Sequence, residues 1–380
     1  MRLIKFTAPW TLFLYLLSAV VCISPGMANE QQQLPQVSAR SALLLDVNNG
    51  QILYEKGHRE PRPIASTTKI MTAVVALGGA DINNTVAVSP RAAAVGESSM
   101  YLEAGETLTL EQLLYGALLC SGNDACVAVA EHVAGTEDFF VQLMNEKAVL
   151  LGAEATSFRN TNGLPANGHY STALDLALLA RYALHDPAFC RIVKTRARII
   201  EGPGGINHYL QNTNKLLWQY PGADGVKTGT TVAAGKCLVA SATRGHRHLL
   251  AVVLNGSNRF ADAGQMLDYG FNKFEDIQTV YAGAVHDRVG VTGGVAETVP
   301  VKAVDDITVN LRVDGTDRIE KRVKLVRSID APVCEGQLLG EIGVFVNGCK
   351  VGDTDIVASC TIDKMSLIQN SIKLVKDACR

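Results

Sequence analysis

The segment PRPIASTTKIMTAVVAL, residues 61–77, places a hydroxyl group and an amine one helical turn apart at the start of an apolar run. Ser66 and Lys69 are three residues apart, so on a helix their side chains lie on one face, within reach of each other. The free N–H groups at a helix N-terminus favour negative charge there. A serine in this position can attack a carbonyl carbon if Lys69 is neutral and accepts the hydroxyl proton.

Lys69 can act as a base only if its amine is neutral. Lysine ordinarily has a pKa of about 10.4, so keeping it neutral at pH 7 costs roughly 4.6 kcal/mol unless burial or a nearby cation lowers the pKa. A second cation is therefore expected close to Lys69. By itself, the Ser-x-x-Lys pattern is equally compatible with an N-cap serine followed by a surface lysine.

Two further polar motifs follow along the chain. The segment LLCSGNDACVAVA places Ser-Gly-Asn at residues 121–123, in a tight turn between two apolar helical stretches. The segment GVKTGTT places Lys-Thr-Gly at residues 227–229, just before a predicted hairpin. Each motif alone is compatible with an ordinary turn or loop. All three together, each present once and in this order, predict one catalytic site around Ser66.

Apolar periodicity predicts strands at both ends of the first 280 residues and helices between them. SALLLDVNNGQILYEKG, residues 41–57, predicts a β-hairpin around an Asn-Asn-Gly turn. From Ile64 to about Leu184, apolar residues recur every three or four positions, as in amphipathic helices. A second hairpin over 235–256 and a helix over 261–274 follow. This order predicts an α/β (α+β) fold, in which helices cover an antiparallel sheet built from both ends of a domain at 36–280.

A separate all-β domain is expected over 284–360. In ITVNLRVDG, residues 307–315, apolar side chains alternate along one strand and Asp-Gly supplies the turn. This part of the chain has no cluster of titratable residues, so the chemistry is expected in the first domain.

The tail, residues 361–380, has the pattern of an amphipathic helix. Four basic residues outnumber two acidic ones beside its apolar stripe, a composition that an anionic lipid surface attracts. The alternative is a helix that packs on the β domain. The apolar stripe consists of Met365, Ile368, Ile372, Val375 and Cys379.

The N-terminus predicts export of the protein. A basic start, an apolar run over residues 6–21 and the small residues Gly26 and Ala28 fit a secretory signal peptide over 1–28. A retained membrane anchor is the alternative, but Pro9 and the shortness of the run fit a membrane span poorly.

Composition excludes other classes of function. The formal net charge of -2 provides no basic field for nucleic acid. The sequence has neither a Cys-x-x-Cys pair nor a His-Glu-x-x-His motif, so no metal or other cofactor is expected.

The motif-bearing segments resemble the penicillin-binding family of active-site serine enzymes, whose signature is grouped with that of the class A β-lactamases. The resemblance is strongest to the low-molecular-weight, serine-type D-alanyl-D-alanine carboxypeptidases, and it covers nearly the whole chain. It implies a transpeptidase-like catalytic domain followed by a small β domain, with peptidoglycan pentapeptide and β-lactams as ligands. It is carried by SGNDACVAVAEHVAG, NTNGLPANGHYSTALDLALLARYAL and DGVKTGTTVAAGKCLVASATRG.

The resemblance also implies roles for the first two motifs. Ser66 would form an acyl ester and Lys69 would take its proton. Ser121 would relay a proton toward the leaving D-alanine, and Asn123 would hold the substrate amide.

The third motif is implied to bind the substrate carboxylate. Lys227 and Thr228, followed by Gly229, would face this group, and Lys227 would also be the cation that keeps Lys69 neutral. The N–H groups of Ser66 and Thr230 would form an oxyanion hole. Arg259 in SNRFADAG matches a family arginine near the carboxylate pocket, but a surface arginine beside a helix fits nearly as well.

The resulting prediction is an enzyme that is exported, lies on the outer face of the cytoplasmic membrane and removes the terminal D-alanine of stem peptides. A β-lactamase is one alternative, although class A enzymes use a glutamate that SFRNTNGLPANGHYS lacks. A catalytically silent peptidoglycan-binding protein is another, but such a protein has no need of a base beside its serine.

Overall fold

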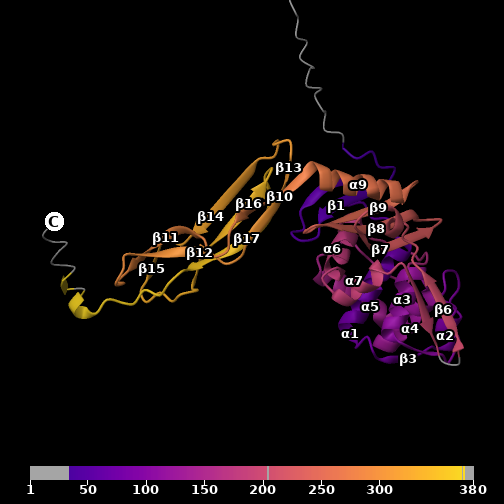
Figure 1. Ribbon diagram of the computed structural model, residues 1–380. Helices are drawn as coiled ribbons and strands as arrows, with labels where there is room; N and C mark the ends of the chain where they lie inside the picture. The colour runs from indigo at the N-terminus through magenta and orange to yellow at the C-terminus, as the bar shows by residue number, and fades with distance from the viewer. Residues whose placement is uncertain (1–33, 203–204, 370, 373–380) are drawn as a thin grey trace, which may run out of the picture. The chain divides into compact units, whose positions relative to one another are not determined.

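The computed structural model describes residues 34–202, 205–369 and 371–372 (Figure 1). The part of the chain before β10 (Phe274–Val280) is built on a five-stranded antiparallel sheet with the strand order β2-β1-β9-β8-β7. The first two strands precede all the helices among the described residues and the other three follow most of them, which confirms a sheet assembled from both ends. The strands are β1 (Ser41–Asp46), β2 (Ile52–Lys56), β7 (Ala223–Thr231), β8 (Gly235–Arg244) and β9 (Arg247–Gly256).

The two faces of this sheet are covered by different helices. Successive side chains of a strand point to opposite faces, and the two cores follow that alternation: Leu43 and Leu45 of β1 face the large helical layer, whereas Leu44 packs with α9 (Arg259–Lys273). Figure 1 shows α9 on one side of the sheet and the other long helices on the opposite side. The predicted layers are therefore confirmed.

The helical layer carries the polar turns that form the site. The helix predicted from Ile64 begins at Lys69, because a 3-10 turn, η1 (Ala65–Thr68), precedes it. The helices are α1 (Lys69–Gly79), α2 (Pro90–Ala93), α3 (Leu110–Tyr115), α4 (Asn123–Ala134), α5 (Glu137–Leu150), α6 (Ala173–Ala183), α7 (Pro187–Lys194) and α8 (Leu216–Gln219), with a π-helical turn, η2 (Gly116–Cys120). Two small ribbons pair β3 (Thr85–Ala87) with β4 (Thr107–Thr109), and β5 (Ala197–Glu201) with β6 (Asn207–Gln211).

The C-terminal part is all β and has its own core of valine, isoleucine and alanine side chains. Six strands form one sheet in the order β14-β16-β17-β12-β11-β15, and β10 pairs with β13. The strands are β10 (Phe274–Val280), β11 (Val285–Thr292), β12 (Thr298–Ala303), β13 (Ile307–Arg312), β14 (Ile319–Leu325), β15 (Ser328–Asp330), β16 (Leu338–Val346) and β17 (Cys349–Ala358).

The end of the chain first joins this β part and then turns helical. Ile362 and Lys364 form isolated β-bridges with Val333 and Gly294. The helix predicted over 361–380 is not formed at 361–366, whereas residues 367–369 and 371–372 are helical. Residues 370 and 373–380 of the tail and the predicted signal peptide lie outside the described residues. Among the residues that the structure describes, no helix is long and apolar enough to cross a membrane.

Candidate active site

The nucleophile turn brings Ser66 and Lys69 into direct contact. In a 3-10 turn, side chains three residues apart are stacked on each other, and Lys69 Nζ lies 3.0 Å from Ser66 Oγ. Ala65, just before the serine, has φ 48°. A non-glycine residue in this left-handed region is strained, which is common where neighbouring structure fixes a reactive group.

The environment of Lys69 suits a neutral amine. Its side chain is fully buried, and Nζ also lies 2.8 Å from Asn123 Oδ1 and 2.8 Å from the carbonyl oxygen of Asn162. A neutral amine has two N–H donors and one lone pair. Both oxygens can only accept, so the two donors go to them and the lone pair is left for the hydroxyl of Ser66. Burial lowers the pKa of Lys69, and the nearby Cys126 thiol opposes this shift.

The second motif meets Lys69 through Asn123 at the start of α4. Besides the contact with Lys69, Asn123 Nδ2 donates to the carbonyl oxygen of Gly96 at 3.0 Å, so neighbours hold both ends of the amide. Ser121, in the left-handed region at φ 68°, follows the π-helical turn η2. Its Oγ is buried without a hydrogen-bond partner. A buried hydroxyl without a partner is costly and is typical of a functional position.

Strand β7 packs directly against the nucleophile turn at Gly229. A Cβ atom at this position would lie only 2.9 Å from the backbone nitrogen of Ser66 and 3.0 Å from the carbonyl oxygen of Ile64. Only glycine allows this approach. The close contact brings the backbone of β7 beside the N–H group of Ser66.

Lys227 is a second buried amine near Lys69. Its Nζ donates to the carbonyl oxygen of Thr228 at 3.0 Å, and Thr228 Oγ1 lies 2.6 Å from Thr213 Oγ1. Burial and then the neighbouring charge of Lys69 lower the pKa of Lys227 well below its ordinary value. A second buried amine is therefore present near Lys69, and its own pKa is also lowered. For Lys69, burial lowers the pKa and the nearby Cys126, Cys120, Asp124 and Glu97 raise it. The cation to which the sequence analysis gave most weight is therefore not a leading cause of the lowered pKa.

Arg259 lies at the first position of α9 and contacts β7. Its NH1 group donates to the carbonyl oxygen of Gly229 at 2.8 Å and to Thr230 Oγ1 at 2.8 Å. These contacts are at odds with a surface arginine that only flanks a helix, because they tie α9 to the Lys-Thr-Gly strand.

Sequence reasoning missed the loop that lies over the start of α1. Asn162 supplies a carbonyl oxygen to Lys69, and Thr72 Oγ1 donates to the carbonyl oxygen of Thr161 at 2.5 Å. At Gly163, φ is +87°, and an added Cβ would lie 2.0 Å from the carbonyl oxygen of Ala65. An Asn-Gly pair such as the one at 162–163 is typical of a turn, but nothing in the sequence indicates its contact with Lys69.

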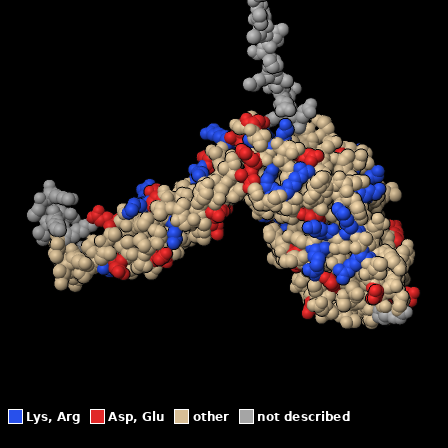
Figure 2. All heavy atoms as spheres, in the orientation of Figure 1, with Lys and Arg blue, Asp and Glu red and all other residues tan. Residues whose placement is uncertain are grey.

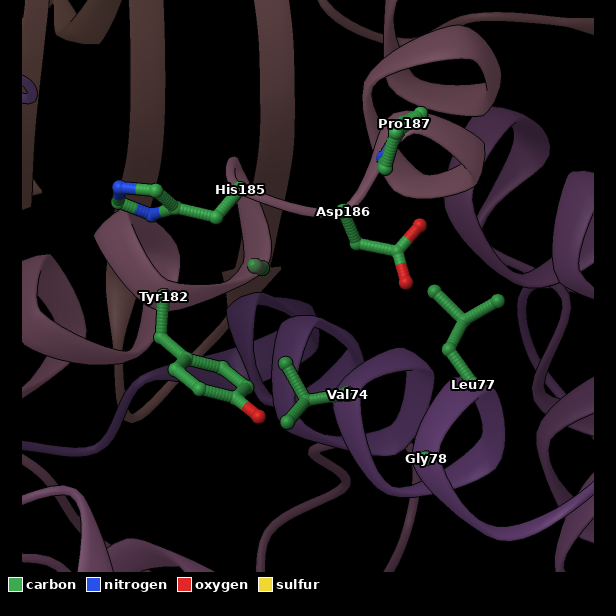
Figure 3. A pocket seen from close by; sticks show the side chains of 8 residues that line it. Val74, Leu77, Gly78, Tyr182, His185, Asp186 and Pro187 are labelled. Atoms are coloured by element: carbon green, nitrogen blue, oxygen red, sulfur yellow. The ribbon is translucent and has the colours of Figure 1, made fainter.

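A different hollow lies beside the C-terminal half of α1. This pocket of about 320 Å³ is lined by Val74, Leu77 and Gly78 and by residues at the junction of α6 and α7, with Tyr182 and Asp186 turned toward it (Figure 3). None of the residues that line it belongs to the three motifs, so it is separate from the candidate active site.

Possible metal-ligating side chains are dispersed in the described part of the chain. Among those residues, no three His, Cys, Asp or Glu side chains are grouped so that they could hold a metal ion. On the visible face, Figure 2 shows both basic and acidic side chains, with several basic groups close together over the middle of the part that contains the helices.

The chain matches known families over most of its length. Residues 27–258 match the family model described as D-alanyl-D-alanine carboxypeptidase, and residues 274–364 match the model of the C-terminal domain of penicillin-binding protein 5. D-alanyl-D-alanine carboxypeptidase DacF of Bacillus subtilis is 35% identical over 340 residues, covering 87% of this chain and 87% of the relative. DacC of Escherichia coli is 33% identical over 354 residues, covering 89% of this chain and 87% of the relative.

Solved structures agree with these matches. The crystal structure of penicillin-binding protein 5 from Haemophilus influenzae has a TM-score of 0.76 and 28% identity, and the match covers 87% of this chain and 99% of that one. The helix-covered antiparallel sheet, with a serine and a buried lysine beside a Lys-Thr-Gly strand, defines the penicillin-binding class of serine-type hydrolases. Within this class, the chain belongs to the D-alanyl-D-alanine carboxypeptidase family.

Proposed function

We propose that the protein removes the terminal D-alanine of peptidoglycan stem peptides through an acyl-enzyme on Ser66. The observation that carries this proposal is the 3.0 Å contact between Ser66 Oγ and the buried amine of Lys69, whose other two partners are both acceptors. In the acylation step, Ser66 Oγ bonds to the carbonyl carbon of the D-Ala-D-Ala peptide bond, and its proton moves to Nζ of Lys69.

The unpartnered hydroxyl of Ser121 supports a role in the departure of the leaving group. Cleavage of the peptide bond requires a proton on the nitrogen of the leaving D-alanine. Ser121 Oγ has a proton to give and no hydrogen-bond partner among the described residues, and Lys69 would restore that proton. Water then hydrolyses the ester, which releases the shortened peptide and regenerates Ser66.

Lys227 and Thr228 are proposed to bind the terminal carboxylate of the substrate, because their polar atoms lie on the strand that faces the nucleophile turn. The N–H groups of Ser66 and Thr230 are proposed to form the oxyanion hole, a role supported by the close approach of Gly229 to Ser66. Arg259 would act here by fixing the backbone of β7. Contact of Asn123 with the substrate amide also remains a prediction. The side-chain amide of Asn123 already contacts Lys69 and the carbonyl oxygen of Gly96, so these contacts by themselves do not require a substrate partner.

Attachment to the outer face of the cytoplasmic membrane is proposed for the tail, after export directed by a signal peptide at 1–28. The described part of the tail leaves three apolar side chains open to solvent, with exposed fractions of 87% for Leu367, 74% for Ile368 and 53% for Ile372. Their exposure supports a lipid surface over packing on the β domain. The proposed segments are 36–280 for catalysis, 284–360 for the β domain and 361–380 for the anchor.

Mass spectrometry of the intact protein after penicillin treatment tests the proposal. We expect a mass increase of one penicillin on the wild type, none on Ser66→Ala, and loss of D-alanine release in the same variant. Turnover of a D-Ala-D-Ala peptide with slow release of penicillin favours a carboxypeptidase. Fast penicillin release without peptide turnover favours a β-lactamase, and neither activity favours a silent binding protein. Labelling that survives Ser66→Ala refutes the nucleophile assignment.

A further inference from the structure

His169 lies in the loop over the start of α1, and none of the three motifs includes it. Its ring is 7% exposed and packs edge-on against Phe158, with ring centroids 5.9 Å apart. A small pocket of about 70 Å³ is lined by His169 together with Ala65, Gly163 and Thr231. The imidazole is therefore in the wall next to the candidate active site.

The hydrogen bonds of this ring fix its tautomer. The backbone N–H of Arg159 points at Nδ1 at 3.1 Å, so Nδ1 must accept and the proton must be on Nε2. Nε2 lies 2.8 Å from Thr68 Oγ1 and donates to it. Thr68 Oγ1 in turn donates to the carbonyl oxygen of Ala65 at 2.8 Å. An ordered chain of donors thus runs from the loop to the residue before Ser66.

The protein keeps this imidazole neutral. Burial, and then the positive charge of Arg159, lowers the pKa of His169 to about 4. A protonated ring would present a second donor to the N–H group of Arg159. The chain of donors therefore holds throughout the neutral pH range.

The same loop meets α1 at neighbouring positions. Lys69 Nζ donates to the carbonyl oxygen of Asn162, and Thr72 Oγ1 donates to that of Thr161. On the far side of the loop, Glu137 Oε1 accepts from Thr161 Oγ1 at 2.8 Å. His169 thus holds the loop at Arg159, whereas Glu137 holds it at Thr161.

We propose that His169 is a positioning residue, which through Thr68 holds segment 159–163 on the first turn of α1 and so keeps the amine of Lys69 buried and aimed at Ser66. This inference rests on the proposed function. Without the contact, the carbonyl oxygen of Asn162 moves away from Lys69 and water reaches the amine. The reacting atoms then lose their alignment, and the amine is more easily protonated.

The test compares acylation by a fluorescent penicillin, from pH 4 to pH 9, in the mature protein and its variants. His169→Ala should lower the second-order acylation rate by about 10- to 100-fold. It should also move the acid limb of the profile to higher pH by about one unit, because Lys69 becomes easier to protonate. The other titratable groups that interact electrostatically with Lys69, and so also affect this acid limb, are Lys227, Cys126, Cys120, Asp124 and Glu97.

Matched variants separate positioning from general damage. Thr68→Val removes the same contact from the η1 side, together with the hydrogen bond to the carbonyl oxygen of Ala65, and should reproduce both effects. The double variant should be no slower than Thr68→Val alone. His169→Gln can place an amide N–H near the Nε2 position and should retain more activity than His169→Asn, which cannot reach Thr68. His185→Ala, in the separate pocket of Figure 3, is the histidine control.

The outcomes are distinct. A slower rate with a shifted limb in Thr68→Val supports the proposal even where His169→Ala does not fold. A lower acylation rate with an unshifted acid limb in folded variants means that a smaller fraction of the enzyme is active, and this result overturns the proposal. A wild-type rate and pH profile in Thr68→Val also overturns it. Failure of the proposed function itself is recognised separately, because Ser66→Ala would then still be labelled.

Discussion

At the scale of single residues, the proposed chemistry depends on the charges around the amine of Lys69, because they decide whether this amine is neutral. Lys69 contacts the neutral amide of Asn123 and a backbone carbonyl, so its contacts provide acceptors without a full negative charge. The amine of Lys227 is buried nearby, and the charge of Lys69 is the second cause, after burial, that lowers the pKa of Lys227. The site thus holds Lys69 as a base by burial and by the absence of a carboxylate at position 123.

Asn123→Asp tests this balance. A carboxylate about 2.8 Å from Lys69 Nζ favours the ammonium form and should raise its pKa by about 1–3 units. The base is active when neutral and therefore above its pKa, so the acid limb of penicillin acylation should move to higher pH. Stopped-flow acylation rates across pH measure the shift. Asn83→Asp adds the same charge at an exposed position and should leave the limb in place, whereas an unmoved limb in Asn123→Asp contradicts a neutral Lys69 as the base.

At the scale of structural elements, the site exists because a strand and a loop reach the nucleophile turn at glycines. Gly229 lets β7 approach the N–H group of Ser66, and Gly163 lets the loop approach the carbonyl oxygen of Ala65. Ala65 itself is held in the left-handed region between them. Packing from both sides thus fixes a strained turn that η1 alone would not keep.

Gly163→Ala should separate the loop from this turn. Its Cβ would lie 2.0 Å from a backbone oxygen, so the loop must move away from Ala65. We expect acylation slower by about 100-fold and a loss of stability beyond the ~1–2 kcal/mol that a left-handed alanine costs. Gly152→Ala, at φ +77° with open space around it, carries only that second cost. Urea unfolding and acylation rates measure both effects, and equal behaviour of the two variants would show that the close approach is unimportant.

At the scale of the whole molecule, the tail must be separated from the β part before its role can be tested. Ile362 is only 7% exposed and bridges to Val333, and the backbone N–H of Met365 donates to the carbonyl oxygen of Gly293 at 2.8 Å. The exposed apolar side chains begin two residues later, at Leu367. Truncation at 361, where the tail pattern begins, therefore removes part of the β core as well.

Deletion of residues 367–380 should release the enzyme from membranes. Fractionation of cells should find the truncated protein in the soluble fraction, with an unchanged melting temperature and near wild-type hydrolysis of a small soluble peptide. Deletion of 361–380 is the contrasting variant and should lower the melting temperature, because it removes the buried Ile362. A 367–380 deletion that still pellets with membranes argues against the anchor.

The sequence by itself determined the features that depend on local pattern. Alternation and turn residues predicted the hairpins of β1 with β2 and of β8 with β9, and three- and four-residue spacing predicted the helices between them. The motifs at 66–69, 121–123 and 227–229 indicated which residues would meet, because each motif occurs once and the three follow one another in a characteristic order.

Only the tertiary structure decided how the site is held together. Lys69 and Asn162 are 93 residues apart, and the contact is made by a backbone oxygen, which any residue type could provide. His169 contacts Thr68 across 101 residues. Burial, which is the largest cause acting on the pKa of Lys69 and lowers it, is a property of the packed core as a whole. Periodicity and motif spacing act over a few residues, so they carry no information on contacts that depend on where a distant loop packs.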